Sequence, residues 1–286
     1  MDQFSRGSFT FPVADSGGSG EPVLLLHGFP QTKESLEPLA DQLAAAGYRT
    51  LRPNQRGYAP EARPRRRRDY RASELAADVA ALIEQLGPSP VHVVGHDWGA
   101  VAAWVTAARH PERLASLTAL SVPHPAAVVE ALATSRQVLA SWYMYLFQLP
   151  WLPERLCGPQ RPGFRARMVR WLVRYGQTRE RAERDLDLLG QDGFSAALGW
   201  YRAILLSPPG ELRRRVRVPT LYVWSDGDTA ITRAAARRCE SMVDAPYEFV
   251  ELQGASHWFP EEMPDRVGDL IVRHLHAHPV PAAAPS

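Results

Sequence analysis

The feature that most constrains the fold is the five-residue run GHDWG at positions 95–99, which stands between a strand pattern and a helix pattern. The apolar run VHVV at 91–94 ends just before it, and residues 98–109 continue as a helix. The two glycines, each two residues away from Asp97, fit a turn so tight that neighbouring backbone leaves no room for side chains. Such a turn raises Asp97 above the edge of a sheet, beside the N–H groups of a helix N-terminus.

Short apolar runs alternate with helical patterns in the first part of the chain and again near its end. This alternation predicts an α/β fold with a mainly parallel central sheet flanked by helices. Ser73 is the expected N-cap of the second helix. The expected strands are 23–26, 48–52, 91–94, 114–122, 220–224 and 247–252, and the expected helices are 35–46, 73–86, 98–109, 230–240 and 265–275.

The pattern changes after Pro123. From there to Arg213 no strand–helix alternation is visible, and aromatic, arginine-rich helical stretches are broken by prolines. We therefore expect an inserted α-helical cap at 123–213, between a first part of the core at 1–122 and a second part at 214–278. The tail at 279–286, rich in alanine and proline, is expected to be disordered.

The composition is that of a soluble globular protein, with 45% hydrophobic and 22% charged residues in 286. A formal net charge of +2 gives no reason to expect a nucleic-acid or membrane partner. The run ARPRRRR at 62–68 lacks interleaved aromatic residues and is interpreted as a solvated loop. With no secretory signal pattern and no run long enough to span a bilayer, a cytoplasmic monomer or homodimer is expected.

Neither the cysteines nor the clustered histidines suggest a metal or redox site. Cys157 and Cys239 fit no metal-ligand spacing and are expected to be buried free thiols. His274, His276 and His278 lie near a helix end and are expected to be exposed, with a spacing that makes no convincing metal site. The sequence therefore predicts no metal and no cofactor.

An aspartate at the centre of the turn implies a particular chemistry. A serine at this place needs a base to remove its proton, whereas a carboxylate is already ionised at neutral pH. Asp97 can displace a leaving group at an sp³ carbon, which forms an ester to the enzyme that activated water must then hydrolyse. Such a site suits epoxides or alkyl halides and not carboxylic esters. The alternative is that Asp97 only caps the following helix.

The segment HGFP at 27–30 follows the first strong strand and is the candidate oxyanion loop. In this arrangement one oxyanion donor is the N–H after the nucleophile, here that of Trp98, and the other comes from the earlier loop, here that of Phe29. His27 and Pro30 are expected to bind substrate beside them. Without the aspartate turn, the segment would be an ordinary Gly-Pro turn.

An acid and then a histidine should follow the nucleophile in chain order. The strand at 220–224 leads into Asp226 and Asp228, and the strand at 247–252 leads into GASHW at 254–258, which contains His257. Both loops lie at strand C-terminal ends, where open α/β sheets place their sites. His257 would accept a proton from water, and Asp228 would orient it. Asp228 is preferred because it lies deeper in the loop, whereas Asp226 could start a turn.

Taken together, HGFP, GHDWGA, the late aspartate and GxxHW resemble the epoxide hydrolases of the α/β-hydrolase superfamily over nearly the full chain. The resemblance implies an α/β-hydrolase fold with a helical lid. It also implies hydrolysis of a small-molecule epoxide by water without a cofactor, and a cis Phe29–Pro30 peptide bond.

Two stretches of the expected cap extend this resemblance. The segment at 141–150 is similar to the family's Y-x-x-x-F-Q-x-P stretch, which implies that Tyr143 is the first lid tyrosine, with Tyr145 the alternative in a different helix register. The segment LGWYR at 198–202 is similar to L-N-W-Y-R and implies that Tyr201 is the second. Their hydroxyls would hold the epoxide oxygen while the rings pack on an apolar substrate. Phe147 and Trp258 are expected to bind substrate.

Three features of the sequence depart from the family pattern. Gly199 replaces the usual Asn, and Asn54 replaces the Asp common before the Q-R-G-Y segment. The N-terminus is short, which suggests that the outermost strand of the sheet is missing.

Haloalkane dehalogenases share the aspartate turn and its neighbouring Trp, but they typically carry Asn where this chain has Phe29. In fluoroacetate-type dehalogenases an Arg usually follows the nucleophile, where this chain has Trp98. A third reading is a non-catalytic scaffold that binds a small ligand in the lid pocket, and the intact triad argues against it. Epoxide hydrolysis by Asp97, His257 and Asp228 is therefore favoured.

Overall fold

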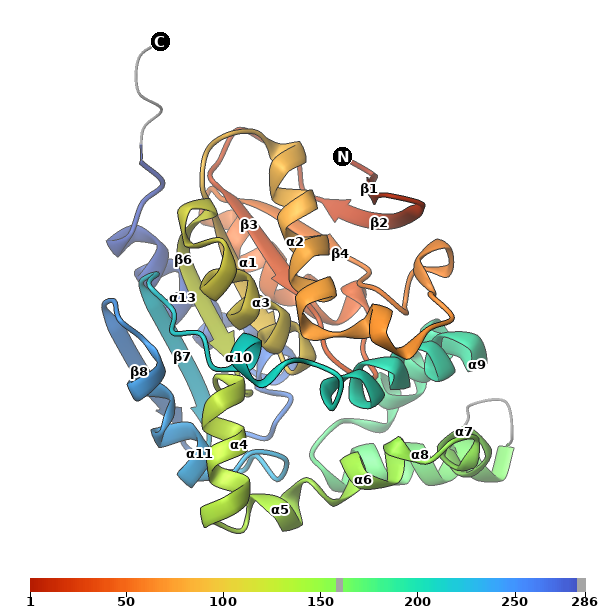
Figure 1. Ribbon diagram of the computed structural model, residues 1–286. Coiled ribbons are helices and arrows are strands. Elements are labelled where there is room, and N and C mark those ends of the chain that lie inside the picture. Colours follow the sequence, from red (N-terminus) through yellow and green to blue (C-terminus); the bar gives the residue numbers. More distant parts are fainter. Residues whose placement is uncertain (158–161, 282–286) are drawn as a thin grey trace.

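The computed structural model describes residues 1–157 and 162–281 of the chain. Eight strands form one sheet in the order β1-β2-β4-β3-β5-β6-β7-β8 (Figure 1). β2 pairs antiparallel with β1 and β4, and all other neighbours are parallel, which confirms the mainly parallel sheet. The strands are β1 Gln3–Arg6, β2 Phe9–Asp15, β3 Pro22–Leu26, β4 Arg49–Pro53, β5 Val91–His96, β6 Leu114–Leu120, β7 Thr220–Ser225 and β8 Tyr247–Leu252.

The expectation that the outermost strand is missing was wrong. The first residues of the chain form β1, which pairs with β2 so that Phe4 lies opposite Phe11. Their rings stack with centroids 4.6 Å apart and both side chains are buried. This apolar pair allows a strand of only four residues to form the sheet edge.

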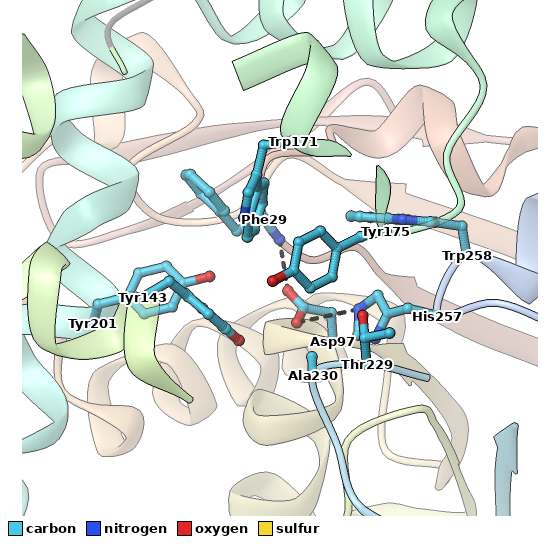
Figure 2. A pocket seen from close by; sticks show the side chains of 10 residues that line it. All are labelled: Phe29, Asp97, Tyr143, Trp171, Tyr175, Tyr201, Thr229, Ala230, His257 and Trp258. Atoms are coloured by element: carbon cyan, nitrogen blue, oxygen red, sulfur yellow. Dashed lines mark hydrogen bonds and ion pairs between the residues drawn. The ribbon is translucent and has the colours of Figure 1, made fainter. Parts of the chain in front are cut away.

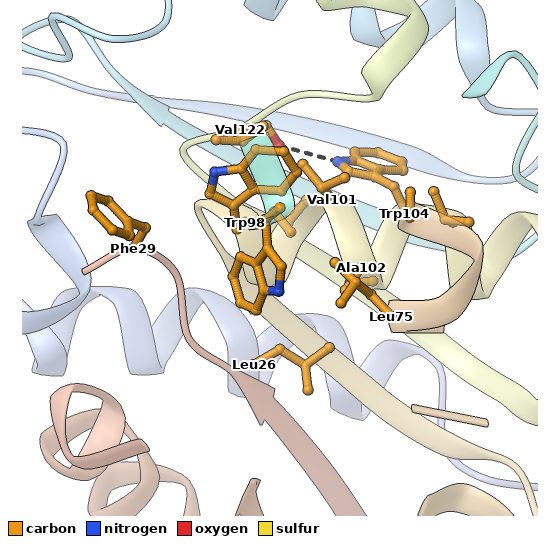
Figure 3. Close-up of a cluster of buried hydrophobic side chains, with 14 of the residues drawn as sticks. Leu26, Phe29, Leu75, Trp98, Val101, Ala102, Trp104 and Val122 are labelled. Atoms are coloured by element: carbon orange, nitrogen blue, oxygen red, sulfur yellow. Dashed lines mark hydrogen bonds between the residues drawn. The ribbon is translucent and has the colours of Figure 1, made fainter. Parts of the chain in front are cut away.

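Helices cover both faces of the sheet. Figure 1 shows α2 and α3 in front of it and α1 behind it. In β3, Leu24 and Leu26 belong to the buried cluster that includes residues of α2 and α3, part of which is drawn in Figure 3. Val23 and Leu25 belong to the cluster that includes residues of α1 and α13. The core helices are α1 Glu37–Ala45, α2 Ala72–Leu86, α3 Trp98–Arg109, α11 Arg233–Arg237, α12 Phe259–Glu262 and α13 Pro264–Ala277, with 3₁₀ turns at Lys33–Leu36, Pro60–Ala62, Arg67–Tyr70, Pro111–Arg113 and Cys239–Met242.

Several boundaries differ from those expected. The helix predicted at 230–240 is only α11 followed by a 3₁₀ turn. Ala230 and Ile231 instead belong to the loop after β7, where their backbone N–H groups bond the Asp228 carboxylate. Ser73 lies inside α2 and is not its cap, since the 3₁₀ turn Arg67–Tyr70 leads almost directly into the helix. β6 ends at Leu120, two residues before the predicted end.

The described part of 123–213 contains helices and no strand. Figure 1 shows α5 and α6 beyond the carboxyl ends of β6 and β7. We call the segment 125–212 the helical insertion. It consists of α4 Pro125–Thr134, α5 Gln137–Ala140, α6 Trp142–Gln148, α7 Leu152–Cys157, α8 Pro162–Arg174, α9 Arg179–Ile204, which is kinked at Gly190, and α10 Pro209–Leu212.

The expectations for the histidines, the cysteines and the tail have different outcomes. His274 is buried and not exposed, because it lies on the same face of α13 as Ile271 and Leu275. Cys239 is a buried free thiol as expected, and burial raises its pKa to about 12. The Cys157 side chain and the tail residues 282–286 lie outside the described part of the chain.

The arginines at 65–68 are exposed, as expected of a solvated loop. Among the described residues, no helix is both long and apolar enough to cross a bilayer.

Candidate active site

The aspartate turn is built as the glycine spacing predicted. β5 ends at His96, Asp97 adopts φ 52°, and α3 starts at the next residue. A Cβ at Gly95 would collide with the carbonyl oxygen of Gly99, and one at Gly99 would collide with that of Leu26. Both positions therefore require glycine, and the left-handed backbone at Asp97 is strained.

Asp97 is bound at both carboxylate oxygens (Figure 2). Its Oδ1 accepts a hydrogen bond of 2.8 Å from the Phe29 N–H, and its Oδ2 lies 3.6 Å from His257 Nε2. Burial disfavours ionisation, but the hydrogen bond and charge of His257 outweigh it, so the pKa of Asp97 lies below its usual value. Asp97 is therefore a carboxylate at neutral pH.

The loop after β3 delivers one of the two predicted oxyanion donors. The Phe29–Pro30 peptide bond is cis, as expected. A Cβ at Gly28 would collide with the Asp97 side chain, so glycine lets the Phe29 N–H approach. The hydrogen bonds of the described residues include none from the Trp98 N–H to Asp97. The oxyanion roles of the Phe29 and Trp98 N–H groups therefore remain predictions, with only the Phe29 N–H in contact with Asp97.

His27 and Pro30 are not among the residues that line the pocket. The His27 ring is fully buried, where its Nε2 accepts a hydrogen bond of 3.2 Å from the Gln55 N–H. Burial lowers the pKa of His27 to about 4, so the ring is neutral at pH 7. His27 therefore supports the loop after β3 from the protein interior.

The loops after β7 and β8 bring Asp228 and His257 together. His257 Nδ1 donates to Asp228 Oδ2 at 2.9 Å, while Asp228 Oδ1 accepts bonds of 2.8 and 3.0 Å from the N–H groups of Ala230 and Ile231. Asp226 instead accepts from the Gly254 N–H at 2.7 Å in an exposed turn. The geometry therefore favours Asp228 over Asp226 as the partner of His257.

His257 lies between two carboxylates. Burial lowers its pKa, but the charges and hydrogen bonds of Asp228 and Asp97 outweigh this effect and raise it to about 10. At neutral pH the ring is therefore an imidazolium in the resting site, and it can become a base only if one of the two negative charges is removed.

His96 supports this arrangement. Its Nε2 lies 3.0 Å from the His257 carbonyl oxygen, and its Nδ1 lies 3.1 Å from Gln31 Oε1. Burial lowers the pKa of His96 to about 4, so the ring is neutral at pH 7 and donates from one nitrogen only. His96 thus stabilises the loop that carries His257 from the protein interior.

Two tyrosines of the helical insertion face Asp97 across the pocket. Tyr143 of α6 and Tyr201 of α9 both line it, with ring centroids 6.1 Å apart, and Figure 2 shows both hydroxyls on the side toward Asp97. Burial, reinforced by the charge of Asp97, raises the pKa of both phenols, so they are proton donors at neutral pH. Tyr145, the alternative to Tyr143, is 56% exposed on the other side of α6.

Of the two remaining residues predicted to bind substrate, only one lines the pocket. Trp258 lines the pocket, whereas Phe147 packs behind it, with its ring centroid 4.9 Å from Tyr201 and 5.8 Å from Tyr143. Phe147 is 3% exposed and orients the two tyrosines.

Sequence reasoning missed several lining residues. Trp171 on α8 and Tyr175 just after it line the pocket, as do Thr229 and Ala230 beside Asp228. The spacing of Trp171 and Tyr175 by four residues in a helical stretch was the one available signal, because it places them on the same face. Among the described residues, no group of three or more His, Cys, Asp or Glu is placed to hold a metal ion.

Comparison with known proteins gives a consistent family. Residues 21–264 match the family described as alpha/beta hydrolase fold. Epoxide hydrolase 3 of Xenopus tropicalis is 32% identical over 270 residues, which cover 91% of this chain and 73% of that protein. The AB hydrolase superfamily protein YfhM of Bacillus subtilis is 32% identical over 279 residues, covering 95% and 96%.

A solved structure agrees with these relatives. The crystal structure of a Bacillus megaterium epoxide hydrolase in complex with an inhibitor has a TM-score of 0.81 and 26% identity, covering 93% of this chain and 97% of that one. The fold, the order of the site residues along the chain and the relatives all indicate the same family. The chain belongs to the epoxide hydrolases of the α/β-hydrolase superfamily.

Proposed function

We propose that this chain hydrolyses an epoxide to a vicinal diol through a covalent ester on Asp97. One observation carries the proposal: the ionised Asp97 faces two protonated tyrosine hydroxyls across a single pocket, and His257 lies beside Asp97. A nucleophile and proton donors on opposite sides of a small ligand are what epoxide opening requires. Phe29, Trp171 and Trp258 make the lining apolar and aromatic, which suits an epoxide with an apolar substituent.

In the first step an Asp97 oxygen attacks an epoxide carbon and the carbon–oxygen bond of the ring breaks. The bonding electrons pass to the epoxide oxygen, which takes a proton from Tyr143 or Tyr201. Oδ2 is the assigned attacking atom, because Oδ1 already accepts from the Phe29 N–H. The result is an ester at Asp97 and one tyrosinate.

In the second step water attacks the Asp97 carbonyl carbon. Ester formation removes one of the two negative charges beside His257, so its pKa falls and the imidazolium gives its Nε2 proton to the tyrosinate. Nε2 of the neutral ring can then accept a proton from water. The Phe29 N–H stabilises the oxyanion. The ester bond then breaks, and the diol oxygen takes the proton from His257. The remaining proton on the new carboxyl group passes to His257, which restores the imidazolium and the Asp97 carboxylate.

We infer that residues 123–213 act as a cap over a core formed by 1–122 and 214–278. The insertion contributes Tyr143, Trp171 and Tyr201 to the pocket, whereas the core contributes the nucleophile and the water-activating pair. Closure of the pocket by a separate helical layer excludes bulk water from the charged intermediates.

The proposal is tested by assaying the purified protein with an aromatic epoxide and with a bromoalkane. Diol release from the epoxide is expected. Halide release without diol formation would assign the site to dehalogenation, and inertness toward both would contradict an enzymatic role.

A further inference from the structure

The residue after β6, Ser121, has an unusual backbone for a serine. Its φ is 72°, and within residues 1–157 and 162–281 the other non-glycine residues with positive φ are Asp97 and the exposed Trp151. Ser121 is completely buried. Its N–H donates to the Val223 carbonyl at 2.9 Å, and its own carbonyl accepts from the Tyr222 hydroxyl at 2.8 Å. The fold therefore holds Ser121 in a strained conformation, which is characteristic of functional sites.

The Ser121 hydroxyl contacts both members of the water-activating pair. Its Oγ donates to Asp228 Oδ2 at 2.7 Å and lies 3.0 Å from His257 Nδ1. Asp228 thus has two partners on each oxygen, Ser121 and His257 on Oδ2 and two backbone N–H groups on Oδ1. The Asp228 side chain has no exposed surface, so bulk water cannot replace the hydroxyl directly.

We propose that Ser121 is a positioning residue for the hydrolytic step: its hydroxyl fixes the plane of the Asp228 carboxylate and thereby aims His257 Nε2 at the water. This inference rests on the proposed ester mechanism. Opening of the epoxide by Asp97 does not need His257 as a base, whereas hydrolysis of the ester does. Loss of the hydroxyl should therefore slow the second step and spare the first.

Two variants separate this role from a merely structural one. Ser121→Ala removes the hydroxyl and keeps a side chain in the left-handed conformation. Ser121→Gly removes the same hydroxyl but relieves the backbone strain, so it should be the more stable of the two. If the hydroxyl positions Asp228, both variants lose the same hydrolytic rate despite their different stabilities. If Ser121 only maintains packing, activity follows stability.

Ser116 provides a matched control. It is a buried serine inside β6, and its Oγ lies 2.8 Å from Nδ1 of another histidine, His92. Ser116→Ala therefore removes the same kind of contact, but toward the other end of β6 and far from Asp97. Its catalysis should match that of the parent chain.

The experiment is rapid quenching with an aromatic epoxide, followed by mass measurement of the peptide that carries Asp97. In both Ser121 variants we expect decay of the ester to slow by about tenfold or more, while its formation changes less than about twofold. Unchanged decay, or equal slowing of formation and decay, would overturn the role of Ser121. Absence of any ester in the parent chain and in the Ser121 variants would instead contradict the proposed function.

Discussion

The two halves of the pocket are held in place by different forces. On the core side, Asp97 and Asp228 are fixed by backbone N–H groups and His257 by a carboxylate. On the insertion side, ring packing dominates. Tyr143 packs on Trp171 at 5.7 Å, and Tyr201 packs on the core residues Phe29 and Trp98, with a hydrogen bond to the Trp98 side chain in addition. Hydrogen bonds are directional, whereas apolar packing is not. Under the proposed function, the core half supplies the nucleophile and the base, and the insertion half supplies the proton donors and much of the apolar lining.

The largest expected effect comes from the nucleophile. Asp97→Asn replaces the attacking carboxylate by an amide, so diol formation should fall by at least about 10³-fold. The variant also removes one negative charge beside His257, so the pKa of His257 should fall from about 10. Diol assays and an NMR titration of the imidazole measure the two effects. A fully active variant with an unchanged titration would contradict the core assignment.

The second-largest effect is expected at His257, the proposed base. In His257→Gln the first step should continue, because Asp97 remains, while hydrolysis should slow by about 10²- to 10⁴-fold. One equivalent of substrate should then accumulate on the peptide carrying Asp97, as detected by mass. A variant that turns over slowly but never carries added mass would argue against this assignment.

The insertion half is tested by removing hydroxyls without removing rings. Tyr143→Phe and Tyr201→Phe should each lower kcat by about tenfold to a hundredfold, and the double variant should be nearly inactive. Because both rings stay in place, the unfolding midpoint should change little. Tyr145→Phe is the matched control on the exposed side of α6, and its kcat should not change. Undiminished turnover in the double variant would refute the role of the two tyrosines.

The pH dependence of stability should reveal the charge coupling within the core half. The folded-state pKa of His257, about 10, lies above its ordinary value of 6.5, so folding binds a proton. Its contribution to stability is fully present below pH 6.5 and is lost as pH rises toward 10. Denaturant titrations should show this loss in the parent chain and a smaller one in Asp97→Asn. Equal losses in both proteins would contradict the coupling between His257 and Asp97.

The smallest effect concerns the contact between insertion and core. A Cβ at Gly199 would lie 2.7 Å from the Tyr70 ring, so Tyr70 occupies space that a side chain would need. Gly199→Ala should lower the free energy of unfolding by about 1–3 kcal/mol. Tyr70→Leu should restore part of that loss in the double variant, as measured by denaturant titration. Additive losses in the double variant would show that the two positions are not coupled.

The same contrast explains how far the sequence could predict the site. Asp97, Asp228 and His257 each follow a strand within a few residues, so local patterns place them at one sheet edge. The tyrosine pair followed from a resemblance, and only the helix register chose Tyr143 over Tyr145. Ser121 could not be predicted, because its partners come from two other loops and its role depends on a left-handed backbone.

The most direct test of the account is a single turnover in water labelled with heavy oxygen, with enzyme in excess over epoxide. The ester mechanism predicts that the label enters the Asp97 carboxylate and that the diol formed in this first turnover is unlabelled. Label found in the diol after one turnover, with none in the Asp97 peptide, would show that water attacks the epoxide directly and would contradict the account.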